Sequence, residues 1–300
     1  MKKKPIYVEI EIDSEMDRLW EATQTPSMHE QWDLRFSSIT YLPKKENEPQ
    51  LFSYKTKVGP GIQVEGWGKS VGSHDGKGGT RTSALHFGTD QAFSPIKEGK
   101  GYWQYKPNKD SITFLTQYDY DINLGWFGEV FDILLFRPLI GWGTALSFDV
   151  LKRWLEKGET PASQYIRFFC QWLFTFLFFF VWLYHGIIPK LISRHPVEIE
   201  MIENIMPLSQ AYAEMAVLVI GLAEVIFAVM WLFYKKKRNL FLTQIILFPL
   251  LAISAIIANP ESLSEPFNPL SFNASLLVIS IAGYLLGKDV PSAASCRRKR

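Results

Sequence analysis

The sequence predicts an α+β domain, with an antiparallel sheet around one long C-terminal helix, followed by an all-α bundle of four transmembrane helices. Three observations predict this organisation. Short segments with alternating apolar and polar residues occupy the first part of the chain, a long apolar-rich helix pattern follows, and four apolar runs fill residues 166–287. A length of 300 residues suits about two domains, and a net charge of +2 gives no indication of a nucleic-acid partner.

The first domain is predicted over residues 1–158. Apolar residues occupy every second position of residues 6–12, which is the pattern of a half-buried strand. The pair Asp13-Ser14 offers capping oxygens to a short helix over 15–22, and Pro26 opens a second short helix. Along the chain, this strand and the two short helices are expected to precede the other strands.

Further strands are predicted over residues 39–42, 51–58, 62–70 and 80–87, with a glycine-rich turn over 72–79. A hairpin is predicted from residues 102–105 and 112–122. In its second strand, apolar and aromatic side chains share one face with Thr116. A long helix is expected over about 126–156, with a kink at Pro138.

This order of elements resembles the helix-grip fold of the START-like superfamily (SRPBCC, polyketide cyclase) over about residues 5–157. The stretch Arg-Pro-Leu-Ile-Gly-Trp at 137–142, continuing through Ser-Phe-Asp at 147–149 to Trp-Leu-Glu at 154–156, is similar to one branch of it. The resemblance implies an apolar cavity between sheet and helix, which in the family commonly holds a lipid, sterol, polyketide or aromatic molecule. Some members are enzymes and many only bind, so whether this chain is an enzyme stays open.

Polar side chains that could point into such a cavity are Arg35, Glu65, His86 and Tyr118. For each of them, an ordinary surface or core position is the competing interpretation. The five histidines have no metal-ligand spacing, so no metal site is expected, and no hydrolase, P-loop or dinucleotide motif occurs. The sequence therefore assigns no catalytic residue and makes no cofactor evident.

The second domain is predicted over residues 161–290, where Thr160-Pro161 is a helix start. Its four apolar runs lie near 166–188, 208–234, 240–258 and 272–287. The first three reach or approach the ~20 residues that cross a bilayer, and the fourth is a little short. We therefore expect a multi-pass protein of the cell membrane.

The charges between the runs are sorted by sign. The second run is followed by Lys235–Arg238 and the fourth by Lys288 and the basic tail 291–300, whereas the connection 259–268 has no Lys or Arg. Since positive residues favour the cytoplasmic side, both termini are predicted to be cytoplasmic, although Lys190 and Arg194 after the first run do not support this orientation. Cysteines on that side stay reduced, so no disulfide is expected.

Several motifs of the second domain resemble the DoxX-like family of small four-helix membrane proteins over about residues 165–287. They are Trp-Leu-Tyr-His-Gly at 182–186 with Pro189-Lys190, Gly-Leu-Ala-Glu at 221–224, and Pro-Phe-Asn-Pro-Leu at 266–270. The resemblance implies a membrane fold. It carries only a weak implication of quinone or sulfur redox chemistry, because the family's namesake belongs to a thiosulfate:quinone oxidoreductase.

Glu224 lies near the middle of the second run, where an ionisable group costs at least ~2.5 kcal/mol and needs a partner. Gly221 would let a neighbouring helix come close. We expect two intramembrane polar layers, with His185, Lys190 and Glu214 in the outer one and Glu224 with Gln171 in the inner one. A structural role, a ligand or quinone site and a proton relay stay open for Glu224.

The sequence thus favours a cytoplasmic helix-grip domain that binds a hydrophobic small molecule or lipid next to a DoxX-like membrane bundle. A membrane oxidoreductase subunit working with quinone at Glu224 and His185 is the alternative, and cyclase or hydratase chemistry in the grip cavity is the third hypothesis. The expected partners are the lipid bilayer and the hydrophobic molecule. A membrane protein partner or a second copy of the chain stays open.

Overall fold

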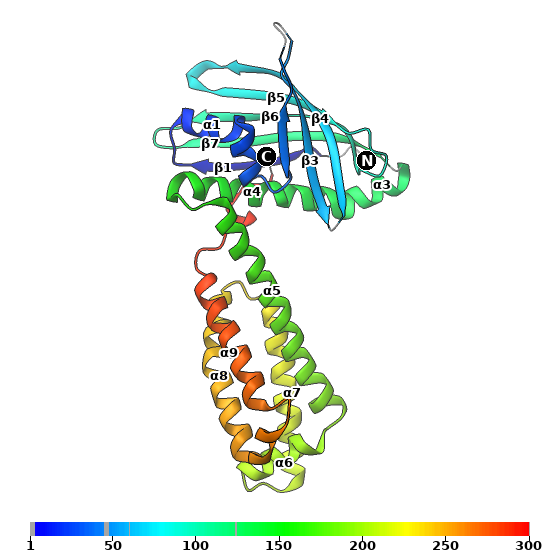
Figure 1. The fold of residues 1–300 in the computed structure, drawn as a ribbon, viewed down its shortest axis with the longest axis vertical. Coiled ribbons are helices and arrows are strands. Elements are labelled where there is room, and N and C mark those ends of the chain that lie inside the picture. The colour runs from blue at the N-terminus through cyan, green and yellow to red at the C-terminus, as the bar shows by residue number, and fades with distance from the viewer. Residues whose placement is uncertain (1–3, 45–47, 60, 124, 300) are drawn as a thin grey trace. The chain divides into compact units, whose positions relative to one another are not determined.

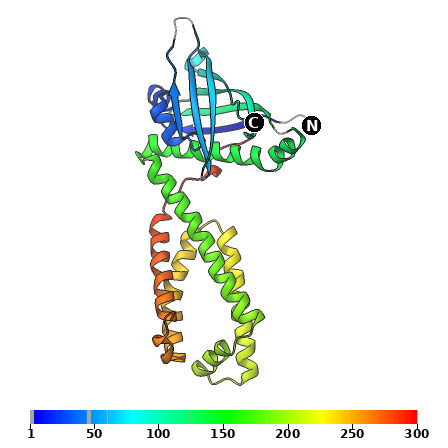
Figure 2. The same cartoon turned by 45° about the vertical axis from the view of Figure 1, so that its right-hand side comes forward.

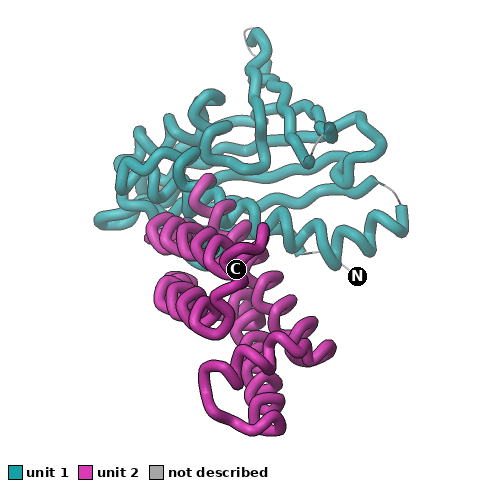
Figure 3. Tube along the Cα trace, turned by 60° about the horizontal axis from the view of Figure 1, so that its bottom comes forward, with its two compact units in different colours: residues 1–165, 291–300 teal, residues 166–290 magenta. Residues whose placement is uncertain are grey.

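The computed structural model describes residues 4–44, 48–59, 61–123 and 125–299. These residues form two compact units, one made of residues 1–165 with 291–300 and the other of residues 166–290 (Figure 3). The sequence predicted a boundary near 158–161 and a separate tail over 291–300. In the structure, the tail is part of the first unit.

The first unit contains, within its described residues, a seven-stranded sheet with the order β1-β7-β6-β5-β4-β3-β2 (Figure 1). Every neighbouring pair is antiparallel. The strands are β1 (Ile6–Ile12), β2 (Ser38–Tyr41), β3 (Leu51–Gly59), β4 (Ile62–Asp75), β5 (Arg81–Gly88), β6 (Ile96–Pro107) and β7 (Ile112–Ile122).

Two short helices, α1 (Met16–Gln24) and α2 (Pro26–Trp32), connect β1 to β2. After β7 a long helical stretch passes along one face of the curved sheet (Figure 2). It consists of α3 (Gly125–Phe131), a π-helical turn η2 (Asp132–Phe136) and α4 (Arg137–Lys157). The sequence predicted a kink at Pro138, whereas the structure has its irregularity at the π-helical turn over Asp132–Phe136 and places Pro138 in the first turn of α4. The predicted α+β class, with a sheet around a long C-terminal helix, is confirmed.

The core of the first unit lies between β7 and α4. Every second residue of β7 from Ile112 to Tyr120 is buried, as the alternation predicted. The ring of Phe114 stacks on that of Phe148 of α4, with 4.5 Å between their centroids, and both rings are fully buried. Aromatic burial of this kind contributes about 1.5–3 kcal/mol for each side chain.

The end of the chain returns to this unit and pairs with β1. Glu9 and Arg297 exchange two backbone hydrogen bonds of 2.9 Å each. The backbone N–H of Ser292 donates to Asp149 of α4 at 2.8 Å, and the Cys296 thiol donates to the Ala145 carbonyl at 3.2 Å. Since β1 is an edge strand of the sheet, the tail satisfies backbone groups that would otherwise be unpaired.

The second unit is helical. The helices are α5 (Pro161–His185), continued by the π-helical segment η3 (Gly186–Ile192), then α6 (Pro196–Ile205), α7 (Gln210–Phe233), α8 (Lys237–Ala258) and α9 (Pro269–Leu286). Residues of its core include Phe178, Trp182, Trp231, Phe241 and Phe248. The Asn268 side chain accepts a hydrogen bond from the Ser271 backbone at 2.8 Å, which is the cap that starts α9.

Five helices of the described chain are long and apolar enough to cross a membrane, and one of them is Gly125–Lys157. The other four are the helices expected from the apolar runs. Phe148 and Leu151, in the C-terminal half of Gly125–Lys157, are fully buried within the first unit, so that half belongs to the core of the grip domain. Helix α6 was not predicted.

Candidate functional site

The strand register identifies the side chains of the sheet that face the long helix. The hydroxyl of Tyr118 lies 3.0 Å from Oγ1 of Thr144 on α4, so this side of β7 is the inner face. Tyr118 pairs with Gly101, and Gly101 with Leu85. Directly paired residues of neighbouring strands share a face, so the inner face extends from Tyr118 across β6 to β5.

Aromatic rings lie over glycines on this inner face. A Cβ added to Gly99 would be 2.5 Å from the ring of Phe87, and one added to Gly68, which pairs with Phe87, would collide with the ring of Phe52. Glycine is therefore needed beneath each of these rings. The half-buried apolar side chains of this surface and of the adjacent loop are Phe36, Phe52, Leu85 and Phe87.

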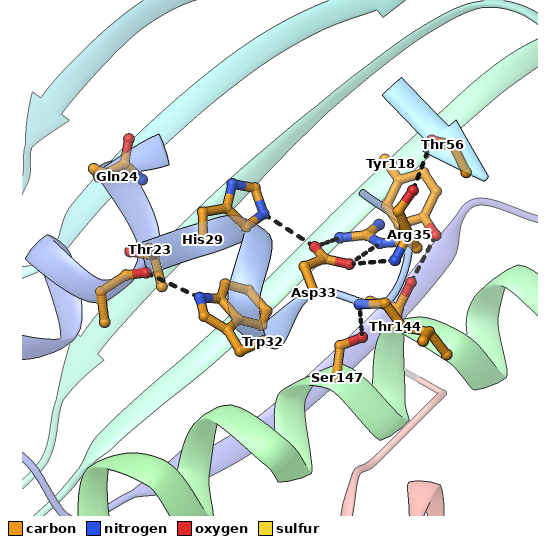
Figure 4. A network of polar contacts seen from close by, with 12 residues as sticks. Thr23, Gln24, His29, Trp32, Asp33, Arg35, Thr56, Tyr118, Thr144 and Ser147 are labelled. Carbon is orange, nitrogen blue, oxygen red and sulfur yellow. Dashed lines mark hydrogen bonds and ion pairs between the residues drawn. The ribbon is translucent and has the colours of Figure 1, made fainter. Parts of the chain in front are cut away.

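A buried ion pair borders this surface (Figure 4). Asp33 follows α2 directly, and its side chain is fully buried. Arg35 donates from Nε to Oδ1 of Asp33 at 2.9 Å and from Nη2 to Oδ2 at 2.6 Å. The carboxylate also accepts the backbone N–H of Arg35 at 3.1 Å. Because this fork uses Nε and Nη2, Nη1 of Arg35 is directed away from Asp33.

The surroundings of the pair are aromatic. The guanidinium carbon of Arg35 lies 5.5 Å from the ring centroids of both Phe36 and Tyr118. The Nε2 atom of His29 is 3.1 Å from Oδ2 of Asp33, and the His29 ring stacks on Trp32 with 5.0 Å between centroids. The guanidinium is thus held between a carboxylate and aromatic faces, a setting that favours a permanently charged arginine.

Hydrogen bonds to α4 and β3 fix the loop that carries Arg35. The Leu34 backbone N–H donates to Oγ of Ser147 on α4 at 2.9 Å. The Thr56 hydroxyl donates to the Arg35 carbonyl at 2.7 Å. The Thr144 hydroxyl donates to the Ile140 carbonyl at 2.8 Å, so the hydrogen bond between Tyr118 and Thr144 is donated by Tyr118. The site is therefore preorganised by the fold.

Burial and charge act in opposite directions on these groups. Burial alone would raise the pKa of Asp33, but Arg35 and His29 outweigh it and hold that pKa well below its usual range. Burial alone would lower the pKa of Arg35, but Asp33 raises it above its ordinary value. Burial raises the pKa of Tyr118, so its hydroxyl stays protonated. The pair is ionised at every physiological pH.

The four residues predicted to line a cavity are divided between the two faces of the sheet. Arg35 and Tyr118 come together on the inner face, as described above. Glu65 lies on the opposite face of β4, where it pairs with Lys55 at 2.9 Å. His86 is on the outer face of β5, with Nε2 at 2.5 Å from Oε1 of Glu98 and its ring edge-on to Trp67 at 5.1 Å.

A pocket of about 330 Å³ adjoins the outer-face group. Trp67 and Glu98, which contact His86, line it together with Thr89, Asp90, Lys97 and others. Charges of both signs meet in it. Among the described residues, no group of three histidine, cysteine or acidic side chains could hold a metal ion.

The second unit contains a largely buried ion pair. Nζ of Lys190 lies 3.2 Å from Oε2 of Glu224 and 3.3 Å from Oε1 of Glu198, and the Lys190 side chain is 9% exposed. A Cβ on Gly186 would be 2.7 Å from the Gly221 carbonyl, so these two glycines permit a close contact between η3 and α7. The close approach expected at Gly221 is present, and it lets Lys190 reach Glu224.

This pairing differs from the two predicted layers. Glu224 pairs with Lys190, whereas Glu214 accepts a hydrogen bond from Gln210 at 3.1 Å and Gln171 is half-buried on α5. The His185 ring packs against Phe272 at 5.5 Å. The physical reason is the π-helical segment η3, whose wider turn changes the direction of Lys190 relative to a regular helix.

The comparisons with known proteins agree with this architecture. Residues 179–281 match the DoxX-like family. The membrane protein YndG of Bacillus subtilis (strain 168) is 48% identical over 188 residues, which cover 62% of this chain and 70% of that protein.

Two solved structures are similar to the first unit at low identity. A STAR-related lipid transfer protein from Xanthomonas axonopodis has 15% identity, a TM-score of 0.38 and coverage of 50% of this chain and 85% of its own. A truncated norcoclaurine synthase from Thalictrum flavum has 13% identity, a TM-score of 0.36 and coverage of 51% and 94%.

Proposed function

The chain belongs to the same family as the membrane protein YndG. From this premise we propose that its helix-grip unit binds a hydrophobic small molecule or lipid and acts together with a DoxX-like membrane bundle. The protein is a membrane protein with a DoxX-like domain. The proposal concerns the inner face of the first unit and an amphiphilic ligand with an apolar body and one oxygen acceptor.

The observation that supports the proposal is the orientation of Arg35. Asp33 holds the guanidinium through Nε and Nη2, so Nη1 lies outside this fork, and Arg35 also interacts with the Tyr118 hydroxyl. The rings of Phe36 and Tyr118 lie beside the guanidinium, and the ring of Phe87 is edge-on to that of Tyr118. Ligand sites combine an apolar lining with a few fixed polar groups, which is the composition found here.

The polar end of the ligand follows from the same geometry. A carbonyl, carboxylate or phosphate oxygen can accept from Nη1, and a charge-assisted hydrogen bond of this kind is about twice as strong as a neutral one. The apolar body would rest on the rings of Phe87 and Phe52, which lie over Gly99 and Gly68. No bond is made or broken in this proposal, and the first unit acts as a binding module.

Mass spectrometry tests the proposal by identifying the molecules that co-purify with the full chain in mild detergent. The variant Asp33→Asn/Arg35→Gln removes both charges together and so leaves no unpaired buried ion. We expect it to lose a bound amphiphile that the parent protein retains. The control His86→Gln, on the outer face, should retain it. Equal retention by the parent and the double variant would contradict the proposal.

The membrane topology is part of the proposal. We infer that α5, α7, α8 and α9 cross the cell membrane and that both termini are cytoplasmic, because Lys235–Arg238 connects α7 to α8 while residues 259–268 carry no Lys or Arg. A cysteine at Leu263, which is 43% exposed, should react with an impermeant maleimide in intact cells. One at Lys236 should require permeabilised cells, and the reverse result would invert the topology.

One observation favours quinone binding as a second candidate. Gln244 of α8 is fully buried, and neither its amide nitrogen nor its amide oxygen has a hydrogen-bond partner among the described residues. Phe241 and Phe248 lie within one turn of it on the same helix. A planar ring with carbonyl oxygens fits an aromatic site with one amide donor. Under this candidate the co-purified molecule is a quinone that Gln244→Leu loses and Asp33→Asn/Arg35→Gln retains.

A further inference from the structure

The helical stretch before α4 exposes large apolar side chains. Trp126 is 71% exposed, Phe127 77% and Leu134 74%. The same stretch also exposes Val130, Phe131, Ile133, Leu135 and Leu139 by more than a third. Soluble domains rarely present so many large apolar groups together, and such patches mark interaction or membrane surfaces. We call residues 126–139 the apolar segment.

The apolar segment is anchored to the domain by one side only. Gly128 faces inward, because a Cβ there would collide with the Asn123 carbonyl. Asp132, one turn later, is fully buried and accepts hydrogen bonds from the Tyr120 hydroxyl at 2.6 Å and from Nε of Arg137 at 2.9 Å. Helical spacing places Trp126, like Val130, on the side opposite this anchor. The exposed face is therefore held outward and does not belong to the core.

Positive charge lies beside the apolar segment. Nη1 of Arg137 donates to the Lys4 carbonyl at 3.0 Å, so Lys4 lies beside the segment here. Lys2 and Lys3 precede Lys4 in the sequence. The acidic groups around it are Asp119, which Arg137 also contacts at 2.9 Å, the buried Asp132, and Glu129 on the segment itself.

We propose that the apolar segment lies on an anionic bilayer surface, with Trp126, Phe127 and Leu134 inserted at the boundary between headgroups and acyl chains. Interfacial helices combine Trp, Phe and Leu on one side with nearby basic residues in this manner. The chain's own apolar helices keep every copy of the first unit near a bilayer, so the lipid surface is present at high effective concentration. A separate partner protein would have to be recruited.

The test uses the full chain, with Cys170 and Cys296 replaced by serine and one cysteine introduced at Phe127 or Leu134. The control positions are Val58 of β3 and Val71 of β4, which are 65% and 62% exposed and lie outside the segment. Each cysteine carries an environment-sensitive nitrobenzoxadiazole group. The protein is reconstituted in vesicles of phosphatidylcholine with or without phosphatidylglycerol, and quenching by a lipid with a nitroxide at a shallow acyl position is measured.

We expect several-fold stronger quenching at positions 127 and 134 than at the two controls. The difference should shrink in pure phosphatidylcholine and after replacement of Lys2, Lys3 and Lys4 by glutamine. Equal quenching at all four positions would overturn the proposal. Quenching that persists unchanged without anionic lipid would overturn its electrostatic part. Label-to-label quenching that disappears on dilution with unlabelled protein would assign the segment to a contact between copies of this chain instead.

Discussion

Replacement of Arg35 by methionine should destabilise the first unit far more than the loss of an exposed ion pair. The change leaves the Asp33 carboxylate buried without the two guanidinium hydrogen bonds of 2.9 Å and 2.6 Å. Removal of one partner of a buried pair costs about 3–5 kcal/mol. Because the backbone N–H of Arg35 and the ring of His29 still contact Asp33, we expect the lower end, about 3 kcal/mol.

Hydrogen–deuterium exchange of the full chain in detergent measures this effect within the first unit. A loss of about 3 kcal/mol corresponds to exchange on the order of a hundredfold faster for the most protected amides of β7. The double variant Asp33→Asn/Arg35→Met should lose much less, since no uncompensated charge is left. The matched control is Lys55→Met, which breaks the exposed pair with Glu65 and should leave exchange in β7 nearly unchanged.

The contribution of Asp33 to the stability of the first unit changes with pH in one direction. In the parent protein the pKa of Asp33 is depressed, so its contribution is fully present above the unfolded value of about 3.9 and is lost as the pH falls towards the folded pKa. In Arg35→Met only His29 and the backbone N–H of residue 35 oppose the burial of the Asp33 carboxylate, so protonation of this carboxylate removes part of the destabilisation. Acidification should therefore narrow the difference in stability between the two proteins. A difference that is constant with pH, or a double variant as unstable as the single one, would refute this reasoning.

Three further predictions concern the sheet and the tail. Gly99→Ala should lower the free energy of unfolding by about 1–3 kcal/mol because its Cβ would meet the ring of Phe87. Gly143→Ala has open space around its Cβ and should raise that free energy by up to about 1 kcal/mol. Hydrogen–deuterium exchange rates of β6 and of α4 measure the two effects. Burial raises the pKa of the Cys296 thiol to about 12, so at mildly alkaline pH it should react with maleimide much more slowly than a cysteine introduced at Val71; equal rates would contradict the packing of the tail. Arg297→Pro removes the backbone donor to the Glu9 carbonyl and should accelerate exchange in β1, whereas Arg297→Ala keeps that donor and should not.

Local pattern was sufficient for most of the elements, though not for α6, and for part of the inner face. Alternation over residues 6–12 and 112–122 identified β1 and β7 because a strand places successive side chains on opposite faces. The same alternation placed Tyr118 on the buried face of its strand. Arg35 was named only as a polar group that could point into a cavity. These two residues meet because the fold brings the loop after α2 to the inner face of β7, which no local pattern shows.

The remaining candidates depended on long-range register. In a strand successive side chains point to opposite faces, so His86 and Glu65 must lie on the face opposite to their neighbours in the sequence. Which face is the inner one depends on the pairing of β4 with β5, which the sequence does not show. Asp33 was missed because a carboxylate in a loop gives no periodic signal of burial. The only available indication was its position between Trp32 and Arg35. Lys190 and Glu224 were assigned to different layers because a regular helix was assumed where the chain forms a π-helical segment.

The path of the chain supports the proposed topology independently of the positive charges. Residues 1–165 and 291–300 belong to one unit, and the tail is tied to it by the backbone pairing of Glu9 with Arg297. The four long apolar helices of the second unit are therefore an insertion between two segments of one folded unit. A chain that leaves this unit and returns to it must cross the bilayer an even number of times. Four of the five long apolar helices lie between the two segments, which is an even number, whereas Gly125–Lys157 lies within the first unit, where Phe148 is fully buried.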